Sequence, residues 1–248
     1  MPSRNKQTSV AFRASRRRPA AAKLAPAKAA AIKSASIKSA DGKATRESSP
    51  WKPSNERARE REVKRDAVIL AAARAFKARG YHNTTLDDIA AHLNVTKPTI
   101  YYYVTNKEQI LFECFSVGLG QITAALSELA ESQASGREKL LSLMRRYAAT
   151  MATEFGWCMV RVEEQDLSPA MSKRIKQLKS EIDQGIRKLL IQGMEDGSIR
   201  KCDAKMAAFA IAGALNWVGH WYRGGEALTP EQIGDHFSDL LDHGFRPR

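Results

Sequence analysis

From Glu56 to the end of the chain, apolar residues recur at spacings of three and four. This spacing places side chains on one face of an α-helix, and no strand-like alternation of any length interrupts it. The pattern therefore predicts an all-α fold with short loops. The first stripe comprises Val68, Ile69, Ala72, Ala73 and Phe76, and further helices are expected at about 106–130, 136–153, 169–193, 203–223 and 229–243.

The first 55 residues differ in composition from the rest. The 248-residue chain has a formal net charge of +13, and residues 1–55 hold 13 Lys and Arg side chains against Asp41 and Glu47. Ala, Lys, Ser and Pro dominate this segment, so it buries too little apolar surface to offset the entropy cost of ordering. We expect a disordered basic extension over 1–55, which is either a solvated arm or an arm that adds non-specific phosphate contacts. Its Arg- and Ser-rich composition also matches a transit peptide, which we favour less.

Neither a membrane span nor a disulfide framework is expected. The three cysteines are far apart and form no CxxC pair, which favours a reducing cytosol. The mostly apolar stretch 207–222 is too short and too polar to span a bilayer. No nucleophile–base pair, phosphate loop or metal cluster stands out, so a catalytic site, a metal site and a cofactor are not expected.

Residues 84–104 have the pattern of two short helices joined by a three-residue turn. Thr85, followed three residues later by Asp88, has the form of a capping box and predicts a helix start. Asn94 suits a left-handed conformation in the turn, and we expect Val95 to fill the gap between the two helices.

The second of these helices has Thr96 as its expected N-cap and carries three consecutive tyrosines. Neighbouring residues lie about 100° apart around a helix, so the three rings cannot share one buried face. With Ile100 and Val104 on the core side, the outward residues have no expected partner in the monomer. Helix, turn and short helix is the plan of a helix-turn-helix, whose second helix fits the major groove. The outward arc comprises Pro98, Tyr101 and Tyr102, with Thr99 and Tyr103 at its edge; Tyr103 fits a bracing role equally well.

These motifs together resemble the N-terminal DNA-binding domain of the TetR family of bacterial transcriptional regulators. The resemblance covers residues 67–111, from the Ala-rich first helix to the start of the fourth. The residues that carry it are Phe76, Gly80, Tyr81, Thr84, Thr85, Asp88, Ile89, Ala90, Thr99, Ile100, Tyr101, Tyr103, Asn106, Lys107 and Glu108.

The resemblance implies a three-helix helix-turn-helix DNA-binding domain over 56–110 and a helical ligand-binding and dimerisation domain over 111–248. It also implies a cytoplasmic, nucleoid-associated bacterial protein that binds operator DNA as a homodimer and is not an enzyme. Lys107 would clamp a phosphate at the start of the fourth helix. The residues expected on DNA are Thr85, Lys97, Pro98, Thr99, Tyr101, Tyr102, Tyr103 and Lys107.

In the TetR family the C-terminal domain holds a small-molecule pocket, and its last two long helices form the dimer interface. A looser resemblance to members that sense lipid-like catabolites implies a hydrophobic or acyl-CoA-like effector. The segment 151–160 is rich in apolar and soft side chains that suit such a ligand, and equally suit a core. The ligand candidates are Phe155, Trp157, Cys158 and Met159; the dimer candidates are Gly213, Trp217, His220, Trp221, Phe237, Leu240 and Leu241.

The leading functional hypothesis is a dimeric, ligand-released repressor of a pseudo-palindromic operator. One alternative is an activator of the same family, since the position of the operator decides the sign of regulation. Another is a nucleoid-type architectural protein driven by residues 1–55, which would bind DNA without sequence preference and with a steep salt dependence.

Overall fold

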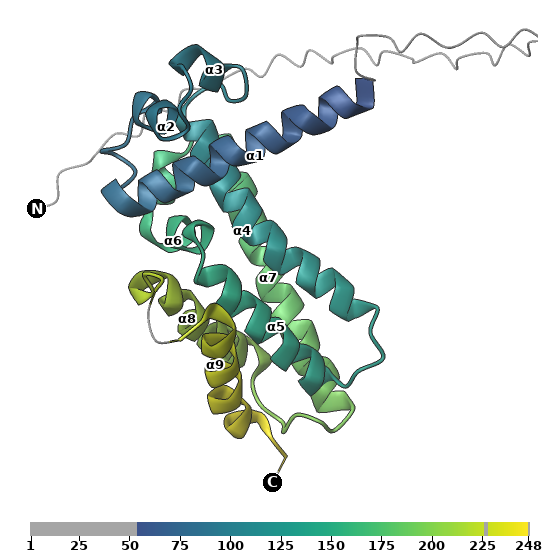
Figure 1. Ribbon diagram of the computed structural model, residues 1–248. Helices are drawn as coiled ribbons and strands as arrows, with labels where there is room; N and C mark the ends of the chain where they lie inside the picture. The colour runs from purple at the N-terminus through teal and green to yellow at the C-terminus, as the bar shows by residue number, and fades with distance from the viewer. Residues whose placement is uncertain (1–53, 226–227, 248) are drawn as a thin grey trace, which may run out of the picture. The chain divides into compact units, whose positions relative to one another are not determined.

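The computed structural model describes residues 54–225 and 228–247, and the regular structure within these ranges is entirely helical (Figure 1). The prediction of an all-α fold is confirmed. The predicted basic extension lies outside the described residues, apart from its last two positions, which begin the first helix. The helices are α1 (Ser54–Arg79), α2 (Leu86–His92), α3 (Lys97–Tyr101), α4 (Lys107–Ala130), α5 (Gly136–Met151), α6 (Glu154–Arg161), the 3₁₀ turn η1 (Glu164–Asp166), α7 (Pro169–Glu195), α8 (Ala204–Trp221) and α9 (Pro230–Phe245).

Local sequence signals set many of the helix ends. The Thr85 hydroxyl accepts a hydrogen bond from the Asp88 N–H, and the Asp88 carboxylate accepts one from the Thr85 N–H, so the predicted capping box is confirmed. Thr229 and Gln232 form the same arrangement at the start of α9. Gly80, after α1, has a φ of 85°, a left-handed conformation that glycine adopts without steric cost.

Helices α1 to α3 pack on the first turns of α4 to form a small head. The predicted stripe of α1 is buried, and Phe76 at its centre is fully enclosed. Ile89 of α2, Ile100 of α3 and Ile110 of α4 are also fully buried, so each helix places one large apolar side chain in the head. The apolar core continues from the head into the remaining helices.

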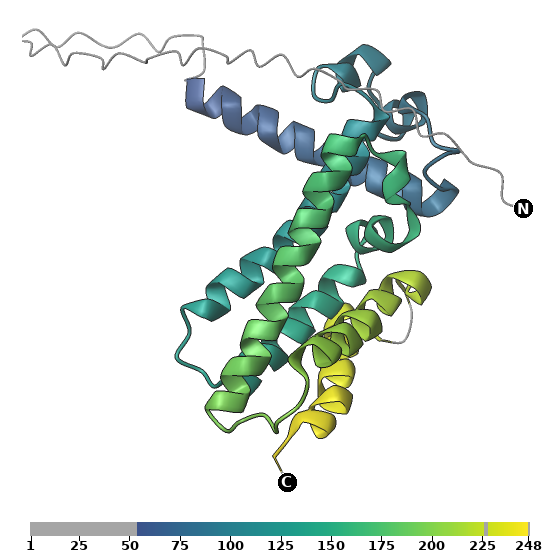
Figure 2. The same ribbon diagram turned by 180° about the vertical axis from the view of Figure 1, so that it is seen from behind.

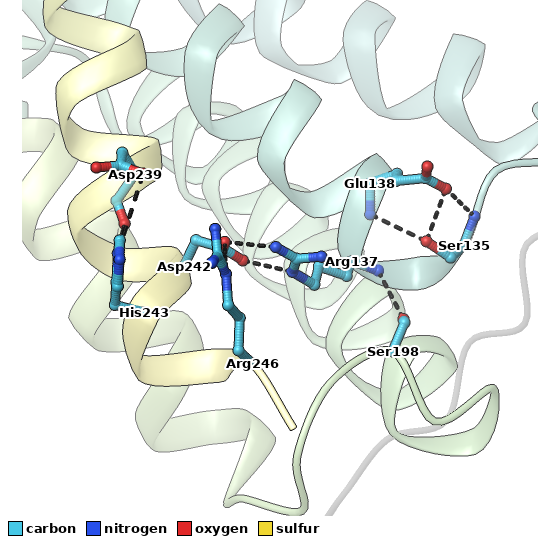
Figure 3. Close-up of polar contacts among 8 residues, drawn as sticks. All are labelled: Ser135, Arg137, Glu138, Ser198, Asp239, Asp242, His243 and Arg246. Carbon is cyan, nitrogen blue, oxygen red and sulfur yellow. Dashed lines mark hydrogen bonds and ion pairs between the residues drawn. The ribbon is translucent and has the colours of Figure 1, made fainter. Parts of the chain in front are cut away.

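In the rest of the chain, α5 packs against α4, α7, α8 and α9 (Figures 1 and 2). The contact between α5 and α9 is close because of Gly234. A Cβ atom at that position would lie 2.9 Å from the carbonyl oxygen of Arg145. At the other end of α9, the Asp242 carboxylate accepts two hydrogen bonds from Arg137, one from Nε and one from Nη2, each at 2.5 Å (Figure 3). A glycine contact and a paired charge thus fix the position of α9 on α5.

Three features differ from the predicted elements. Helix α5 ends at Met151, and a separate helix, α6, follows, because Thr153 caps a new helix by accepting a hydrogen bond from the Gly156 N–H. Helix α3 has only five residues, so Tyr102 and Tyr103 lie in the turn that follows it. Among the described helices, α4 alone is long and apolar enough to cross a membrane by length and composition, and much of its apolar surface is buried in the core.

Candidate DNA-binding interface and effector cavity

The turn between α2 and α3 sets the direction of α3. Asn94 has a φ of 52°, the only positive φ of a non-glycine residue in the described ranges, which agrees with the predicted left-handed position. The side chain of Val95 is 38 % exposed, so the prediction that it fills the gap between the helices is wrong. Leu93, just before the turn, packs against the core instead.

Helix α3 presents one apolar and one open face. Ile100 and Val104 are buried, whereas Tyr101 is 51 % and Tyr102 63 % exposed. Lys97, Pro98 and Thr99 are exposed as well. The arrangement of buried and outward positions therefore agrees with the helical geometry expected from the sequence. Contact of these residues with DNA remains a prediction.

Tyr102 has a partner that the sequence did not indicate. The Arg61 guanidinium, from the N-terminal half of α1, lies 5.1 Å from the centroid of the Tyr102 ring. Tyr103 is half-buried and meets the Tyr102 ring edge-to-face at 5.0 Å. The expectation that Tyr102 touches nothing within the monomer is therefore wrong, and Tyr103 packs against the core as its bracing role would require.

Two further candidates for DNA contact already donate hydrogen bonds within the chain. The Thr85 hydroxyl donates to Asp88 Oδ2 at 2.7 Å, so a phosphate contact would require it to change partner. Lys97 Nζ donates to Asp87 Oδ2 at 2.7 Å, and this hydrogen bond raises the pKa of the Lys97 ammonium. Lys97 retains two further donors for a phosphate because an ammonium group has three.

Lys107, the predicted phosphate clamp, already has partners within the chain. Its Nζ donates to the carbonyl oxygens of Tyr81 at 3.0 Å, His82 at 3.4 Å and Thr84 at 3.1 Å. The same ammonium lies 4.4 Å from the centroid of the Tyr81 ring. All three of its donors are thus used to hold the loop between α1 and α2 on the first turn of α4. These contacts indicate a structural role for Lys107, and a phosphate contact, which stays a prediction, would require it to give up a carbonyl partner.

Substituting Lys107→Met should lower the free energy of unfolding by about 2 kcal/mol, because three carbonyl groups lose a charged donor. Urea denaturation measures this change. The control Lys97→Met removes an exposed lysine and should change the free energy of unfolding little, because its ion pair with Asp87 is exposed to solvent. The salt dependence of DNA binding should not change in Lys107→Met. A shallower salt dependence with unchanged stability would restore the phosphate role.

A cavity of about 240 Å³ lies among α4, α5, α6, α7 and α8. Its polar lining includes Tyr147, whose hydroxyl donates to Asn216 Oδ1 at 2.9 Å. Burial raises the pKa of Tyr147 to about 12, so the phenol is neutral at physiological pH. The lining residues are Leu119, Tyr147, Met159, Val160, Lys179, Ile182, Asp183, Ile186, Phe209, Ala212 and Asn216.

Of the four predicted ligand residues, only Met159 lines this cavity. Cys158 is fully buried, and a hydrogen bond with it, together with burial, raises the pKa of the Cys114 thiol well above its usual range. Trp157 lines a separate cleft near Tyr81. Phe155 is half-buried and packs against the core near α4. The helical period explains these differences, since consecutive residues of α6 face different neighbours.

Helix α8 exposes an apolar stripe. Met206 is 61 %, Phe209 50 % and Trp217 61 % exposed, and with Gly213 they follow the helical spacing of three and four. Leu240 of α9 is 71 % exposed. Of the other predicted dimer residues, His220, Trp221, Phe237 and Leu241 are partly buried, and the His220 ring lies 4.9 Å from that of Trp217.

Comparison with known proteins agrees with this arrangement. Residues 68–114 match the family described as "Bacterial regulatory proteins, tetR family", and residues 133–245 match "Tetracyclin repressor-like, C-terminal domain". The chain belongs to the TetR family. It is therefore a DNA-binding transcriptional regulator of a non-enzymatic family, as the resemblance implied.

Two relatives and one solved structure illustrate the similarity. The chain is 24 % identical over 176 residues to the fatty acid metabolism regulator protein of Bacillus subtilis (strain 168), covering 70 % of this chain and 86 % of that protein. It is 25 % identical over 183 residues to the repressor KstR2 of Mycobacterium tuberculosis (strain ATCC 25618 / H37Rv), covering 72 % and 90 %. The structure of AibR with isovaleryl coenzyme A and operator DNA is 27 % identical, with a TM-score of 0.62, and the match covers 71 % of this chain and 97 % of AibR.

The junction between the TetR head and the remaining helices was not visible in the sequence. Glu108 Oε1 accepts a hydrogen bond from the Ser168 N–H at 2.6 Å, and His82 Nε2 lies 3.4 Å from Asp166 Oδ1. Arg74 of α1 lies 3.7 Å from Glu154 of α6. These pairs join residues far apart in the chain, so no local pattern could have indicated them. Within the described residues, no group of three His, Cys, Asp or Glu side chains could hold a metal ion.

Proposed function

We propose that this chain is a homodimeric repressor whose binding to a pseudo-palindromic operator is released by an effector with an apolar, acyl-like part. The observation that carries the DNA-binding proposal is α3. Ile100, and Val104 just after the helix, are buried and anchor it in the head, while Lys97, Thr99 and Tyr101 are exposed. Side chains of this kind hydrogen-bond to phosphates and base edges in a major groove. We further propose the boundaries 56–110 for the DNA-binding domain and 111–248 for the effector and dimer domain.

The apolar stripe on α8 supports the homodimer. Isolated apolar side chains are common on a protein surface, but a continuous stripe on one helix, extended by Leu240 of α9, is typical of an interface. Gly213 lies within the stripe, and a Cβ added there would meet nothing within 4 Å. A second copy of α8 could therefore approach closely at this position. In a two-fold dimer the same stripe serves both protomers.

The cavity supports the effector class. Seven of its eleven lining residues are apolar, Tyr147 and Asn216 are hydrogen-bonded to each other, and Lys179 and Asp183 of α7 add two charged side chains to the lining. Its volume of about 240 Å³ is below the roughly 300 Å³ at which drug-sized ligand pockets begin. It therefore suits an acyl chain rather than a whole coenzyme A, whose nucleotide would lie outside. AibR, similar to this chain over most of its length, was solved with isovaleryl coenzyme A.

Helix α6 supports a route from effector to DNA. Met159 and Val160 line the cavity, whereas Glu154, at the start of the same helix, lies beside Arg74 of α1. A ligand that displaced α6 would therefore act directly on the head. Release from the operator requires that the ligand bind more tightly to a state of the dimer in which the spacing between the two heads does not match the spacing of the two half-sites.

The test is selection of operator fragments from genomic DNA, followed by binding measurements with and without acyl-coenzyme A thioesters of increasing chain length. We expect enrichment of a palindromic site, and release by thioesters but not by free coenzyme A. Enrichment of no palindrome, with equal affinity for all duplexes, would favour the architectural alternative. A reporter gene downstream of the selected site distinguishes repression from activation.

Filling the cavity should separate effector response from DNA binding. In Ala212→Phe the new ring would occupy the space for an acyl chain, so we expect release by the best thioester to weaken at least tenfold while operator affinity changes little. The control Ala124→Phe places the same ring on an exposed part of α4 and should respond as the wild type does. Fluorescence anisotropy of a labelled operator measures both quantities. An unchanged response in Ala212→Phe would place the effector elsewhere.

A further inference from the structure

We infer that the N-terminal half of α1, residues 54–66, is an additional DNA-phosphate-binding element of this chain. The match to the TetR DNA-binding domain begins at residue 68, whereas α1 begins at Ser54. These preceding residues continue the same helix beyond its crossing with α4 (Figures 1 and 2). The inference rests on the proposed DNA contact of α3 and extends it to a second element.

The side of α1 that carries buried apolar residues near the head carries arginines toward the N-terminus of the helix. Val68, Ala72 and Phe76 lie on the core side, and the same helical spacing continues backward through Arg65, Arg61 and Arg57. At about 100° per residue, Arg57 and Lys64 lie within about 60° of Arg61 around the axis. The four acidic residues of the segment lie at least about 100° from Arg61. These are Glu56, Glu60, Glu62 and Asp66.

This cationic face adjoins the turn that follows α3. A groove is lined by Ala58, Arg61, Glu62 and Arg65 of α1 and by residues 101–105 and Gln109. Arg65 is neutralised there by an ion pair with Glu113. Among the described residues Arg61 has no such ion pair: its guanidinium lies over the Tyr102 ring, and a guanidinium in this position keeps its N–H groups at the ring edge for an acceptor. Within the described residues, Arg57 has no ion pair. It is exposed and lies one helical turn before Arg61, toward the N-terminus of α1.

A DNA phosphate is the occupant that fits these features. Arg61 is in contact with Tyr102, which lies next to Tyr101 on the exposed surface of the head, so the cationic face is continuous with the proposed DNA surface. A guanidinium binds phosphate oxygens in a forked geometry and carries no sequence information when it does so. The segment should therefore strengthen binding to any duplex by the same factor.

The experiment compares the full-length wild type with Arg57→Gln/Arg61→Gln and with Arg59→Gln. Arg59 is an exposed arginine of the same segment that lies about 160° from Arg61 around the helix. Affinity for a duplex carrying the selected operator, and for a scrambled duplex of equal length, is measured over a range of salt concentrations. Circular dichroism confirms that each variant folds. Residues 1–53 are present in every protein, so their contribution cancels.

In Arg57→Gln/Arg61→Gln, the slope of log affinity against log salt should become shallower by about 0.9 for each phosphate that the variant no longer binds, or about 2 per protomer. The decrease in affinity should be equal on the operator and the scrambled duplex, whereas Arg59→Gln should match the wild type. Arg61→Lys should keep the slope because it keeps the charge. A slope unchanged from the wild type, or a decrease confined to the operator, would overturn the inference. A wild type that binds both duplexes equally would instead overturn the proposed operator function.

Discussion

Replacing Asp242 by alanine should lower the free energy of unfolding by about 3 kcal/mol, because it breaks a buried charge pair. The Asp242 side chain is 3 % exposed and receives two hydrogen bonds from Arg137, plus one from Arg246 at 2.6 Å. Removal of the carboxylate leaves the partly buried Arg137 guanidinium without a partner where α5 meets α9 (Figure 3). Thermal and urea denaturation measure the decrease.

Asp239 provides the matched control for Asp242. It lies on α9 one turn earlier, is 74 % exposed and lies 3.9 Å from His243 (Figure 3). Exposed pairs of this kind contribute little, so Asp239→Ala should change the free energy of unfolding by less than about 0.5 kcal/mol. Equal effects of the two substitutions would show that the Arg137 pair does not hold α9 in place.

The same carboxylate predicts a dependence of stability on pH. Hydrogen bonds from Arg137, and then from Arg246, lower the pKa of Asp242 in the folded state. Its contribution is therefore fully present above the unfolded pKa of about 3.9 and is lost as pH falls through the lower folded pKa. Between about pH 5 and pH 3, the wild type should lose more stability than Asp242→Asn, because the variant has no proton to bind at this position.

Substituting Trp217→Glu should convert the proposed dimer into monomers and weaken operator binding by roughly 10² to 10⁴-fold. Trp217 is 61 % exposed in the α8 stripe, and a two-fold axis would place the substituted residue twice in the same interface. Burial of a carboxylate without a partner opposes association. Each monomer would then bind one half-site, without the high effective concentration that the dimer gives to its second head.

Light scattering coupled to size-exclusion chromatography gives the mass, and fluorescence anisotropy gives the operator affinity of Trp217→Glu. Val63→Glu is the control, because Val63 is 62 % exposed on α1, outside the stripe, and its substitution should leave the dimer intact. If Trp217→Glu remained a dimer with full affinity, the proposed interface on α8 would be excluded.

Local chemistry made much of the head predictable. A capping box, a left-handed asparagine and a glycine stop act within a few residues of one another, so Thr85, Asn94 and Gly80 could be assigned from the sequence. The burial of Ile100 and Val104 followed from the helical period alone. The recognised family motif then supplied the function that these local signals could only indicate.

The sequence did not indicate contacts in which a side chain meets a partner distant in the chain. Lys107 had the composition and position of a phosphate ligand, yet its ammonium is held by carbonyls 23 to 26 residues earlier. The ligand candidates of α6 were chosen as a run of apolar residues, although only Met159 lines the cavity. Position along the chain does not indicate which side of a short helix faces which neighbour.

The sequence by itself determined that this chain is helical, where most helices begin and end, and that it is a TetR-family DNA-binding regulator. These properties depend on apolar and capping residues a few positions apart and on one motif that is continuous in the sequence. Only the tertiary structure decided which residues enclose the cavity, that Lys107 fastens the head, that Arg61 meets Tyr102 and that Arg137 pairs with Asp242. Those contacts join residues 23 to 105 positions apart. Helix packing, which no short pattern encodes, brings them together.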